Sequence, residues 1–232
     1  MGRPISHAVK RIDVGGKLIT NHLKEAISFR QWNMMDETFL VNEVKELCCL
    51  ISQKFHEDQE LCRRSFPDNT VKLDYVLPDM ALGTKGFIRS PGVDAARPDE
   101  QVLVMNNERF TVPEILFNPS DIGIEQAGIP EAIIQAVQQI DPDLQGLFYS
   151  NILVVGGNAH LPGFKERLET ELRSLIPLEF DLGLTVADRP DTAAWHGAVN
   201  WVRRYPENFR QKCVTRQDYL EHGHNICQQS FD

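Results

Sequence analysis

Apolar residues recur along much of the chain with the spacing of α-helices. The clearest example lies between residues 37 and 55, where apolar side chains fall every three or four positions and define one helical face. These side chains are Leu40, Val44, Leu47, Ile51 and Phe55. The same spacing predicts further helices at residues 18–27, 128–140, 162–177 and 194–201.

Shorter apolar segments have the patterns of β-strands. Residues 70–78 alternate apolar and polar positions, as a half-buried strand does, and a proline closes the segment. Residues 151–155 contain four consecutive apolar side chains, which indicate a buried strand. Residues 56–69 are polar and residues 82–100 are rich in glycine and proline, so we expect both segments to be irregular.

Two further β elements are expected next to glycine or asparagine pairs. Residues 7–17 contain a short apolar segment that ends in two glycines, and we expect a strand there. Residues 101–112 are interpreted as a hairpin with Asn106 and Asn107 at the turn, because asparagine tolerates positive φ. Strands and helices that alternate along a chain predict an α/β fold.

Both glycine pairs, Gly15–Gly16 and Gly156–Gly157, lie where a predicted strand gives way to a helix. Glycine allows a backbone to approach a flat or anionic ligand, so the two corners are consistent with one cleft approached from two sides. The alternative is that both pairs form tight turns needed only for packing. Gly156 and Gly157 do not fit the G-x-G-x-x-G motif. They do not fit the phosphate-binding loop G-x-x-x-x-G-K-[ST] either, because no Lys-Ser or Lys-Thr follows them.

The composition disfavours some partners and compartments. The chain has 232 residues, enough for one large domain or two small ones, and a formal net charge of −9. This charge gives no overall attraction to nucleic acids or acidic membranes, and no apolar run approaches the ~18 residues of a membrane span. The five cysteines are an odd number and include the adjacent pair Cys48 and Cys49, which fits a reducing compartment such as the nucleus or cytoplasm.

Motifs for other chemistry are weak. The first residues fit the myristoylation pattern M-G-x-x-x-[ST], with Gly2 and Ser6 in register, but this short pattern arises often by chance. His222, His224 and Cys227 are metal-ligand types, yet structural zinc sites use four ligands, so we interpret these residues as part of a polar C-terminal loop. No motif for a serine or cysteine nucleophile is present. We therefore predict no metal site and no catalytic residues.

Five longer segments resemble the actin family. They occur in the order and spacing of the C-terminal half of actin, from about His7 to Phe231. The segments read RIDVGGKLITNHL, EVKELCCLI, NERFTVPEILFNPSDIGIEQAGIPEAI, LVVGGNAHLPGF and AAWHGAVN. The resemblance implies a partial actin-like fold, of the superfamily that includes heat-shock-chaperone ATPases. The expected part is the second lobe with the C-terminal fringe of the first.

The resemblance also implies a division of the chain into parts. Residues 1–14 and 125–192 correspond to subdomain three of actin, and residues 15–124 correspond to subdomain four. Residues 193–232 correspond to the C-terminal piece of subdomain one. In the family, the cleft between the two lobes holds the nucleotide.

Nucleotide-binding positions of the family are carried over onto the matching segments. These positions are Gly16, Lys45, Glu46, Gly156, Gly157 and Asn158. Three other positions depart from the family pattern. Asn42 replaces a basic residue, Leu161 replaces a tyrosine that lines the adenine pocket, and Asp191 replaces a lysine that flanks the base.

We expect this site to be incomplete, with ATP as the only cofactor that the family implies. In the family pattern, two phosphate-binding hairpins and the residues that position the hydrolytic water lie upstream of Met1. Hydrolysis requires phosphate cradling, a metal ion and a positioned water. The chain is therefore not expected to be an enzyme.

Within the family, several segments look most like the nuclear actin-related members of chromatin remodellers that exchange a variant core histone into nucleosomes (SWR/SRCAP type). The resemblance implies a non-catalytic subunit in the nucleus, with the cytoplasm as a second compartment. Its expected partners are other remodelling-complex subunits. The nucleosome would be contacted indirectly, and no membrane is expected.

Two other functions stay open. One is an ATP-binding actin homologue of the cytoskeleton, and the other is half of a chaperone-like or sugar-kinase-like ATPase, which the actin-specific segments disfavour. Asp121 disfavours the cytoskeletal alternative, because actin has an aromatic residue at this position on a loop between filament strands. A carboxylate buried there would lose its hydration, so no filament self-assembly is expected.

Overall fold

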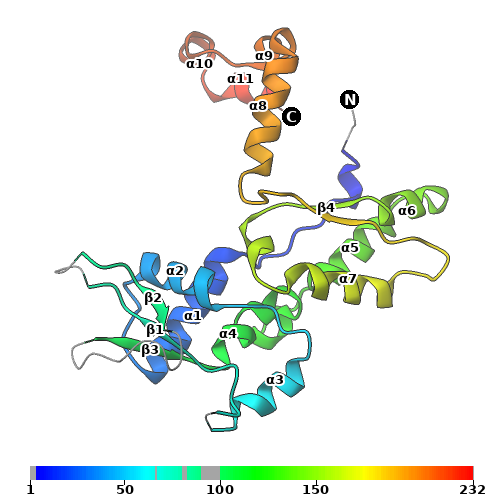
Figure 1. Ribbon diagram of the computed structural model, residues 1–232. Helices are drawn as coiled ribbons and strands as arrows, with labels where there is room; N and C mark the ends of the chain where they lie inside the picture. The colour runs from blue at the N-terminus through cyan, green and yellow to red at the C-terminus, as the bar shows by residue number, and fades with distance from the viewer. Residues whose placement is uncertain (1–3, 66, 80–82, 90–99, 232) are drawn as a thin grey trace.

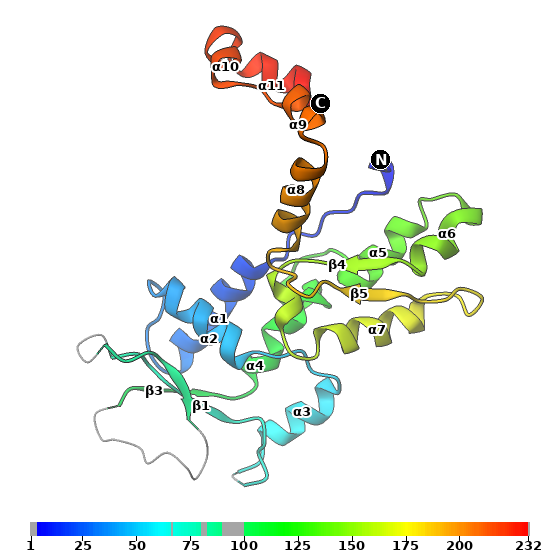
Figure 2. The same cartoon turned by 45° about the horizontal axis from the view of Figure 1, so that its top comes forward.

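The computed structural model describes residues 4–65, 67–79, 83–89 and 100–231. It is a mixed α/β structure in three parts (Figure 1). The first part spans residues 16–105 and the second spans residues 108–186. The third, residues 193–231, is a series of helices that extends away from the other two parts (Figures 1 and 2). The predicted mixed α/β class is confirmed.

The first part combines helices with an antiparallel sheet. Its helices are α1 (Gly16–Arg30), α2 (Thr38–Cys48) and α3 (Phe55–Cys62). Its strands are β1 (Leu73–Val76), β2 (Phe87–Arg89) and β3 (Val102–Met105). β1 is the central strand, and Tyr75 pairs with Ile88 of β2 and Leu103 of β3. The strand predicted at residues 70–78 is confirmed.

Helix α1 forms because its apolar residues share one buried face. Ile19, Leu23 and Ile27 are almost completely buried, which confirms the helix predicted at residues 18–27. No side chain caps the N-terminus of α1, where Gly15 is extended. The first amide groups of α1 therefore lack a side-chain acceptor.

Helix α2 is shorter than its pattern predicts, because the backbone after residue 47 forms hydrogen bonds with distant residues instead of continuing the helix. The carbonyl of Cys48, the last helical residue, accepts a hydrogen bond from Arg109 Nε at 2.8 Å. Leu50 then donates to the carbonyl of Arg109 at 2.9 Å, and Ile51 donates to the carbonyl of Pro162 at 2.8 Å. These bonds hold the chain extended where the apolar spacing would continue the helix.

The second part is a parallel β-α-β unit with two preceding helices. Its strands are β4 (Ile152–Val154) and β5 (Leu184–Val186), and its helices are α5 (Ile129–Val137), α6 (Pro142–Tyr149) and α7 (Phe164–Leu175). Helix α7 connects the two parallel strands. The strand predicted at residues 151–155 and the helices predicted at residues 128–140 and 162–177 are confirmed, whereas β5 was not predicted.

Short helical turns connect these elements. They are η1 (Ser6–Ala8), α4 (Glu108–Thr111), η2 (Pro113–Leu116), η3 (Pro119–Ile122) and η4 (Gly157–His160). The hairpin predicted at residues 101–112 is wrong, because α4 occupies its second arm and β3 pairs with β1 instead. The helical turn places Arg109 where its side chain bonds to Cys48.

Other sequence-based expectations are also wrong. Residues 82–100 were expected to be irregular, but β2 (Phe87–Arg89) lies among them. Residues 56–69 were expected to be irregular, but α3 covers their first half. Along α2, the buried face is rotated relative to the predicted one, so that Val41 is buried and Leu47 is exposed. The rotation also buries Lys45, which then needs hydrogen-bond partners inside the protein.

Residues 7–17 do not form the predicted strand. A strand needs a neighbouring strand to bond its backbone, and no described strand pairs with this segment. It meets side chains and loops instead: His7 Nε2 lies 3.1 Å from the carbonyl oxygen of Gln139, and Asp13 exchanges two 2.8 Å hydrogen bonds with the side chain of Gln126. Gly2, the residue of the myristoylation pattern, lies outside the described residues.

The third part has no buried residue of its own. Its helices are α8 (Ala193–Arg204), α9 (Pro206–Lys212), α10 (Arg216–His222) and α11 (His224–Phe231). Trp201 contacts Tyr205 and Phe209, with ring centroids 6.3 and 6.5 Å apart. The helix predicted at residues 194–201 is confirmed. No helix in the described part of the chain is long and apolar enough to cross a membrane.

The prediction of a polar loop at the C-terminus is wrong, because α10 and α11 form that part of the chain. Helix α10 begins with a capping box, in which Thr215 and Asp218 satisfy each other's free backbone amides. Among the described residues, no group of three or more His, Cys, Asp or Glu side chains is arranged to hold a metal ion.

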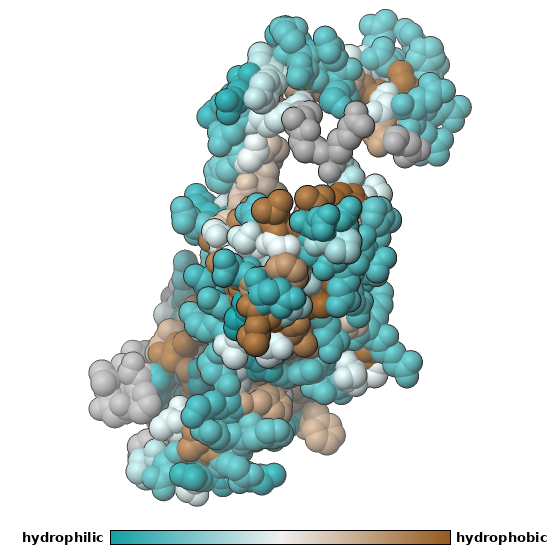
Figure 3. All heavy atoms as spheres, turned by 90° about the vertical axis from the view of Figure 1, so that its right-hand side faces the viewer, coloured by the Kyte–Doolittle hydropathy of each residue, from teal (hydrophilic) through white to brown (hydrophobic). Residues whose placement is uncertain are grey.

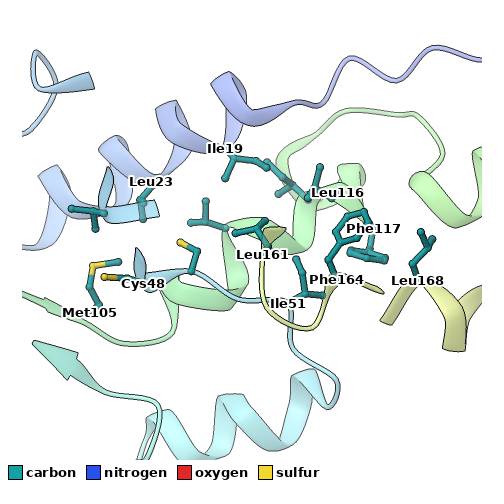
Figure 4. Packing of buried hydrophobic residues seen from close by; sticks show 14 of the residues in the cluster. Ile19, Leu23, Cys48, Ile51, Met105, Leu116, Phe117, Leu161, Phe164 and Leu168 are labelled. Atoms are coloured by element: carbon teal, nitrogen blue, oxygen red, sulfur yellow. The ribbon is translucent and has the colours of Figure 1, made fainter. Parts of the chain in front are cut away.

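One hydrophobic core runs through the first and second parts. In Figure 4, Leu161 and Ile51 lie between residues of α1 and α2 on one side and residues of α7 on the other. Leu168 of α7 is fully buried at the far end of this cluster. The two parts are therefore joined by continuous apolar packing.

Arg167 forms a buried ion pair within the second part and also bonds to the backbone of the first part. Arg167 of α7 donates to Glu114 of η2 at 2.7 Å and to the carbonyl of Ser52 at 2.7 Å. Its guanidinium also lies over the ring of Phe117, 5.1 Å from the centroid. Burial raises the pKa of Glu114, and the bonds from Arg167 and Asn118 oppose that rise. The carboxylate can stay charged in the interior because these donors surround it.

Candidate functional site: a glycine-bordered cavity between the first two parts

A cavity of about 950 Å³ lies between the first and second parts. The N-terminal turn of α1 and one face of α2 form one wall, and η4 forms the other. Five of the six residues expected to bind nucleotide border this cavity. They are Gly16, Lys45, Glu46, Gly157 and Asn158. The structure therefore brings together residues from three separate segments.

Lys45 is held by the protein itself. Its Nζ donates to Asn42 Oδ1 at 2.8 Å, to Thr20 Oγ1 at 3.1 Å and, at the longer distance of 3.4 Å, to the carbonyl of Gly16. An ammonium group has three donors, so all of them have partners inside the chain. Burial lowers the pKa of Lys45, and the neighbouring carboxylate of Glu46 opposes that change. In this arrangement Lys45 ties α1 to α2.

Asn42 connects Lys45 to Glu46. Its Oδ1 accepts from Lys45, and its Nδ2 donates to Glu46 Oε1 at 2.7 Å. A basic residue at this position could not accept from Lys45. The replacement of the family's basic residue by asparagine therefore converts one edge of the cavity into an internal network. Glu46 itself borders the cavity.

Gly16 faces Asn158 across the cavity. A Cβ atom on Gly16 would lie 3.3 Å from Asn158 Oδ1 and 3.6 Å from Lys45 Nζ. A larger residue would force the walls apart or displace the amide of Asn158. Glycine at this position therefore leaves room for the side chains of Asn158 and Lys45.

Gly156 has a different position from the other five residues. It lines a neighbouring apolar groove with Val14, Ile152 and Val154. Its φ of 109° lies in the region that favours glycine, and its amide donates to the carbonyl of Pro190 at 2.6 Å. Gly156 therefore turns the chain from β4 into η4 and positions Gly157 at the cavity.

His160 and Asp191 form a polar pair at the cavity that the sequence did not predict. His160 Nε2 and Asp191 Oδ1 are 3.2 Å apart, and both side chains are partly exposed. The hydrogen bond with His160 holds the pKa of Asp191 below its usual value. Asp191 was noted only as a departure from the family pattern, and no signal in the sequence links it to a residue 31 positions away.

Leu161 is part of the core as well as the cavity wall. It is buried against residues of both parts, so its side chain provides only an apolar contact surface for a ligand. Together with Phe39, which also borders the cavity, it can contact a flat base. Neither residue can recognise a base by hydrogen bonding.

The described residues fit the nucleoside portion of ATP better than its phosphates. Glu46 and Asn158 can bond to hydroxyl groups, and Gly16 and Gly157 allow close approach. Lys17 and the uncapped start of α1 are the groups on this wall that suit an anion, since Lys45 is already engaged. Nucleotide binding by these residues stays a prediction.

The α/β class and the gathering of five expected residues at one cavity agree with the resemblance. The chain belongs to the actin family, because the family's sequence model, described as Actin, matches residues 1–232. The resemblance stated above is thereby confirmed.

Curated relatives place the chain close to one group within that family. It is 43% identical to actin-like protein arp6 of Emericella nidulans, over 99% of this chain and 52% of that protein. It is 41% identical to actin-related protein 6 of Drosophila melanogaster, over 96% of this chain and 56% of that protein. It is 39% identical to actin-related protein 6 of Arabidopsis thaliana, over 98% of this chain and 58% of that protein. The chain thus spans about half the length of the curated relatives it matches, and its fold is a partial actin fold.

Proposed function

We propose that the chain is a non-catalytic, actin-related subunit of a nuclear chromatin-remodelling complex that exchanges a variant core histone into nucleosomes (SWR/SRCAP type). The observation that carries the proposal is the identity of about 40% to actin-related protein 6 along almost the whole chain. The relatives' names state no activity, so the role in histone exchange comes from the family resemblance.

The cavity supports a structural role. Lys45 directs all its donors to acceptors of the chain, and Asn42 ties it to Glu46. A cation that is already satisfied gains little from a ligand phosphate, because existing hydrogen bonds would have to break. The cavity wall therefore serves as a fixed joint between α1 and α2 in the absence of any ligand.

ATP is a compatible ligand of this joint. Gly16, Glu46, Gly157 and Asn158 would hold its nucleoside portion. When bound, the nucleotide would supply a phosphate chain and a link between the two walls. A ligand that bridges both walls would stabilise the folded chain by mass action. The residues of this chain would bind and orient the nucleotide, and we assign proton transfer to none of them.

The surface of α8 supports a role in assembly. Trp195 is 69% exposed, although it lies on a strongly amphipathic helix with no buried residue. A large exposed aromatic side chain on such a helix indicates a surface that a partner covers. Subunits of the remodelling complex are the proposed partners, with contact to the nucleosome through them.

The filament-forming alternative gains no support from the position of Asp121. Its side chain is exposed on η3, and burial between filament strands would remove its hydration without a described cation to compensate. We accordingly propose that the chain does not assemble into filaments.

Co-purification from nuclei tests the proposed function. A tagged chain should recover the remodelling ATPase subunit and the variant histone, identified by mass spectrometry. A Trp195→Ser variant should recover several-fold less of both. The control variant Phe29→Ser changes a still more exposed aromatic residue on α1 and should behave as wild type. A chain that pellets as regular polymer, or that recovers cytoskeletal proteins and no remodelling subunit, would contradict the proposal.

A further inference from the structure

Helix α6 presents its apolar face to solvent. Leu144, Leu147 and Phe148 are all exposed, and their spacing of three and four residues puts them on one side of the helix. The opposite side contains Gly146 and the buried Tyr149, which face the second part. Single exposed apolar residues are common on protein surfaces, but a complete apolar helix face turned outward is not.

The loop between α7 and β5, residues 177–183, continues this surface. It lies beside α6 at the same end of the second part (Figures 1 and 2). Phe180 packs on Tyr149 with ring centroids 5.7 Å apart, and the amide of Gly183 donates to the carbonyl of Tyr149 at 2.9 Å. Leu178, two residues before Phe180, is 94% exposed. The space-filling view of this side shows apolar residues gathered between hydrophilic ones (Figure 3).

Internal hydrogen bonds hold this loop in place. Arg173 of α7 donates from Nη1 to the carbonyl of Phe180 at 2.8 Å, and from Nη2 to the carbonyls of Ile176 and Pro177 at 3.0 and 2.9 Å. A Cβ atom on Gly146 would lie 2.9 Å from the ring of Phe180, so glycine at this position lets the loop pack closely on α6. A loop fixed in this way loses little conformational entropy when a partner binds.

Carboxylates border the apolar residues. Asp143 on α6 and Glu179 and Asp181 on the loop are exposed, and none of them forms an ion pair with another described residue. Beneath the loop, Arg173 directs Nη1 and Nη2 to carbonyl groups and not to these carboxylates. The surface is therefore apolar at its centre and negative at its edge, which suits a partner of opposite charge.

We propose that α6 and the α7–β5 loop form a docking surface, here called the α6 surface, for a protein segment that carries apolar side chains flanked by lysines or arginines. The α6 surface consists of Leu144, Leu147, Phe148, Leu178, Asp143, Glu179 and Asp181. Apolar anchors of the partner would cover the leucines, and its cations would meet the carboxylates at the edge. The inference rests on the proposed role as a subunit and names the chemistry of one of its partners.

Two matched synthetic peptides test this chemistry on the purified chain. Both are amphipathic helices of about 20 residues with leucines at i, i+3, i+4 and i+7, and they differ only in flanking lysines or flanking glutamates. In fluorescence anisotropy, the lysine-flanked peptide should bind saturably and more weakly as salt is added. The glutamate-flanked peptide should bind at least about tenfold more weakly.

Variants assign the binding to this surface. The double variant Leu147→Ser/Leu178→Ser should weaken binding of the lysine-flanked peptide about tenfold, as expected when apolar anchors are removed. Glu179→Gln/Asp181→Gln should weaken it less and flatten its salt dependence. Phe29→Ser, which changes a side chain that is 92% exposed on α1, should bind as wild type. Because all these side chains are exposed, circular dichroism and thermal unfolding should show the native fold in each variant.

Several outcomes would overturn the proposal. They are equal binding of both peptides, undiminished binding by Leu147→Ser/Leu178→Ser, or no binding of either peptide. The co-purification experiment separates this result from the proposed function. If wild type recovers remodelling subunits but the peptides fail, only the α6 surface is wrong. If wild type recovers none, the role as a subunit is wrong whatever the peptides do.

Discussion

The two-part body, residues 16–186, and the C-terminal helices, residues 193–231, use similar sequence patterns to different ends. Helices α7 and α8 have the same length and both are strongly amphipathic. Helix α7 buries Phe164, Leu168 and Leu172 in the shared core, whereas α8 buries none of its residues. An apolar stripe thus indicates that one face of a helix tends to be buried. Whether residues of the same chain bury that face depends on the tertiary structure.

Polar interactions differ between the two regions in the same way. The body contains buried ion pairs and hydrogen bonds, as in Arg167–Glu114 and the Lys45 network. In the C-terminal helices, the pair Arg210–Glu207 is exposed to solvent. Buried partners cannot be exchanged for water, so their removal is costly, whereas exposed partners are replaced by water at little cost. The following matched changes test this contrast.

Arg167→Met should have the largest effect on stability. It leaves Glu114 buried without its cation, which should lower the free energy of unfolding by about 3–5 kcal/mol. Urea denaturation followed by circular dichroism measures the change. The matched variant Arg210→Met removes a solvent-exposed pair and should unfold at the same urea concentration as wild type. Equal losses in the two variants would show that the C-terminal helices are as tightly integrated as the body.

Leu168→Ala should have the next largest effect on stability. Leu168 is fully buried in the core, and such truncations cost about 2–5 kcal/mol from lost apolar burial and the remaining cavity. Leu220→Ala truncates an exposed leucine on α10 and should change the free energy of unfolding very little. Thermal unfolding of both variants provides the measurement. If Leu220→Ala destabilised the protein, α10 would be packed against other residues, and the contrast between the two regions would be wrong.

Thiol reactivity should separate the regions by about two orders of magnitude. Burial raises the pKa of the Cys48 thiol to about 11 and that of Cys49 to about 12, and each unit lowers the reactive thiolate fraction about tenfold. At pH 8, iodoacetamide should therefore modify exposed Cys213 at least about 100 times faster than Cys48. Peptide mass spectrometry follows each site. Comparable rates in the native protein, with both sites fast in guanidinium, would contradict the burial of α2.

The same thiols predict a pH dependence of stability. Their pKa values are raised in the folded state, so their contribution is fully present below the ordinary thiol pKa of 9. It is lost as pH rises toward 11 and 12, because the unfolded chain releases these protons first. Urea midpoints should fall between pH 9 and 11, and less so in a Cys48→Ala/Cys49→Ala variant. An equal fall in that variant would assign the effect to other groups.

A pair of glycine substitutions should have the smallest effects. Gly156→Ala places a side chain at a φ of 109°, which should cost about 1–3 kcal/mol of strain, toward the lower end if the turn relaxes. Gly197→Ala lies within α8, where an added Cβ meets no atom within 4 Å, and should stabilise that helix by up to about 1 kcal/mol. Differential scanning calorimetry compares the two. A destabilising Gly197→Ala would indicate that this face of α8 is already packed.

Much of the fold follows from the sequence alone. The long apolar stripes predicted α1, α5, α7 and α8, and the alternating or continuous apolar runs predicted β1 and β4. These elements succeed because their own periodicity defines a face that must be buried. The sequence also carried enough of the family pattern to bring five nucleotide-type positions to one cavity, although whether they bind nucleotide stays a prediction.

Tertiary structure decided the elements whose backbone bonds go to distant residues. Helix α2 stops at Cys48 because Arg109 and Pro162 bond the chain there, and neither partner is visible in the local pattern. Residues 7–17 fail to form a strand because pairing requires a neighbour, which no local property of the segment can supply.

The cavity shows the same division at the level of single residues. Local sequence placed Lys45 and Glu46 on a helix and Gly157 after a strand. Only the folded chain decided that Lys45 would be rotated into the interior, that Asn42 would join it to Glu46, and that His160 would meet Asp191. Hydrogen bonds between side chains depend on distances across the fold. Periodicity along the chain constrains which face a residue occupies, and it leaves those distances undetermined.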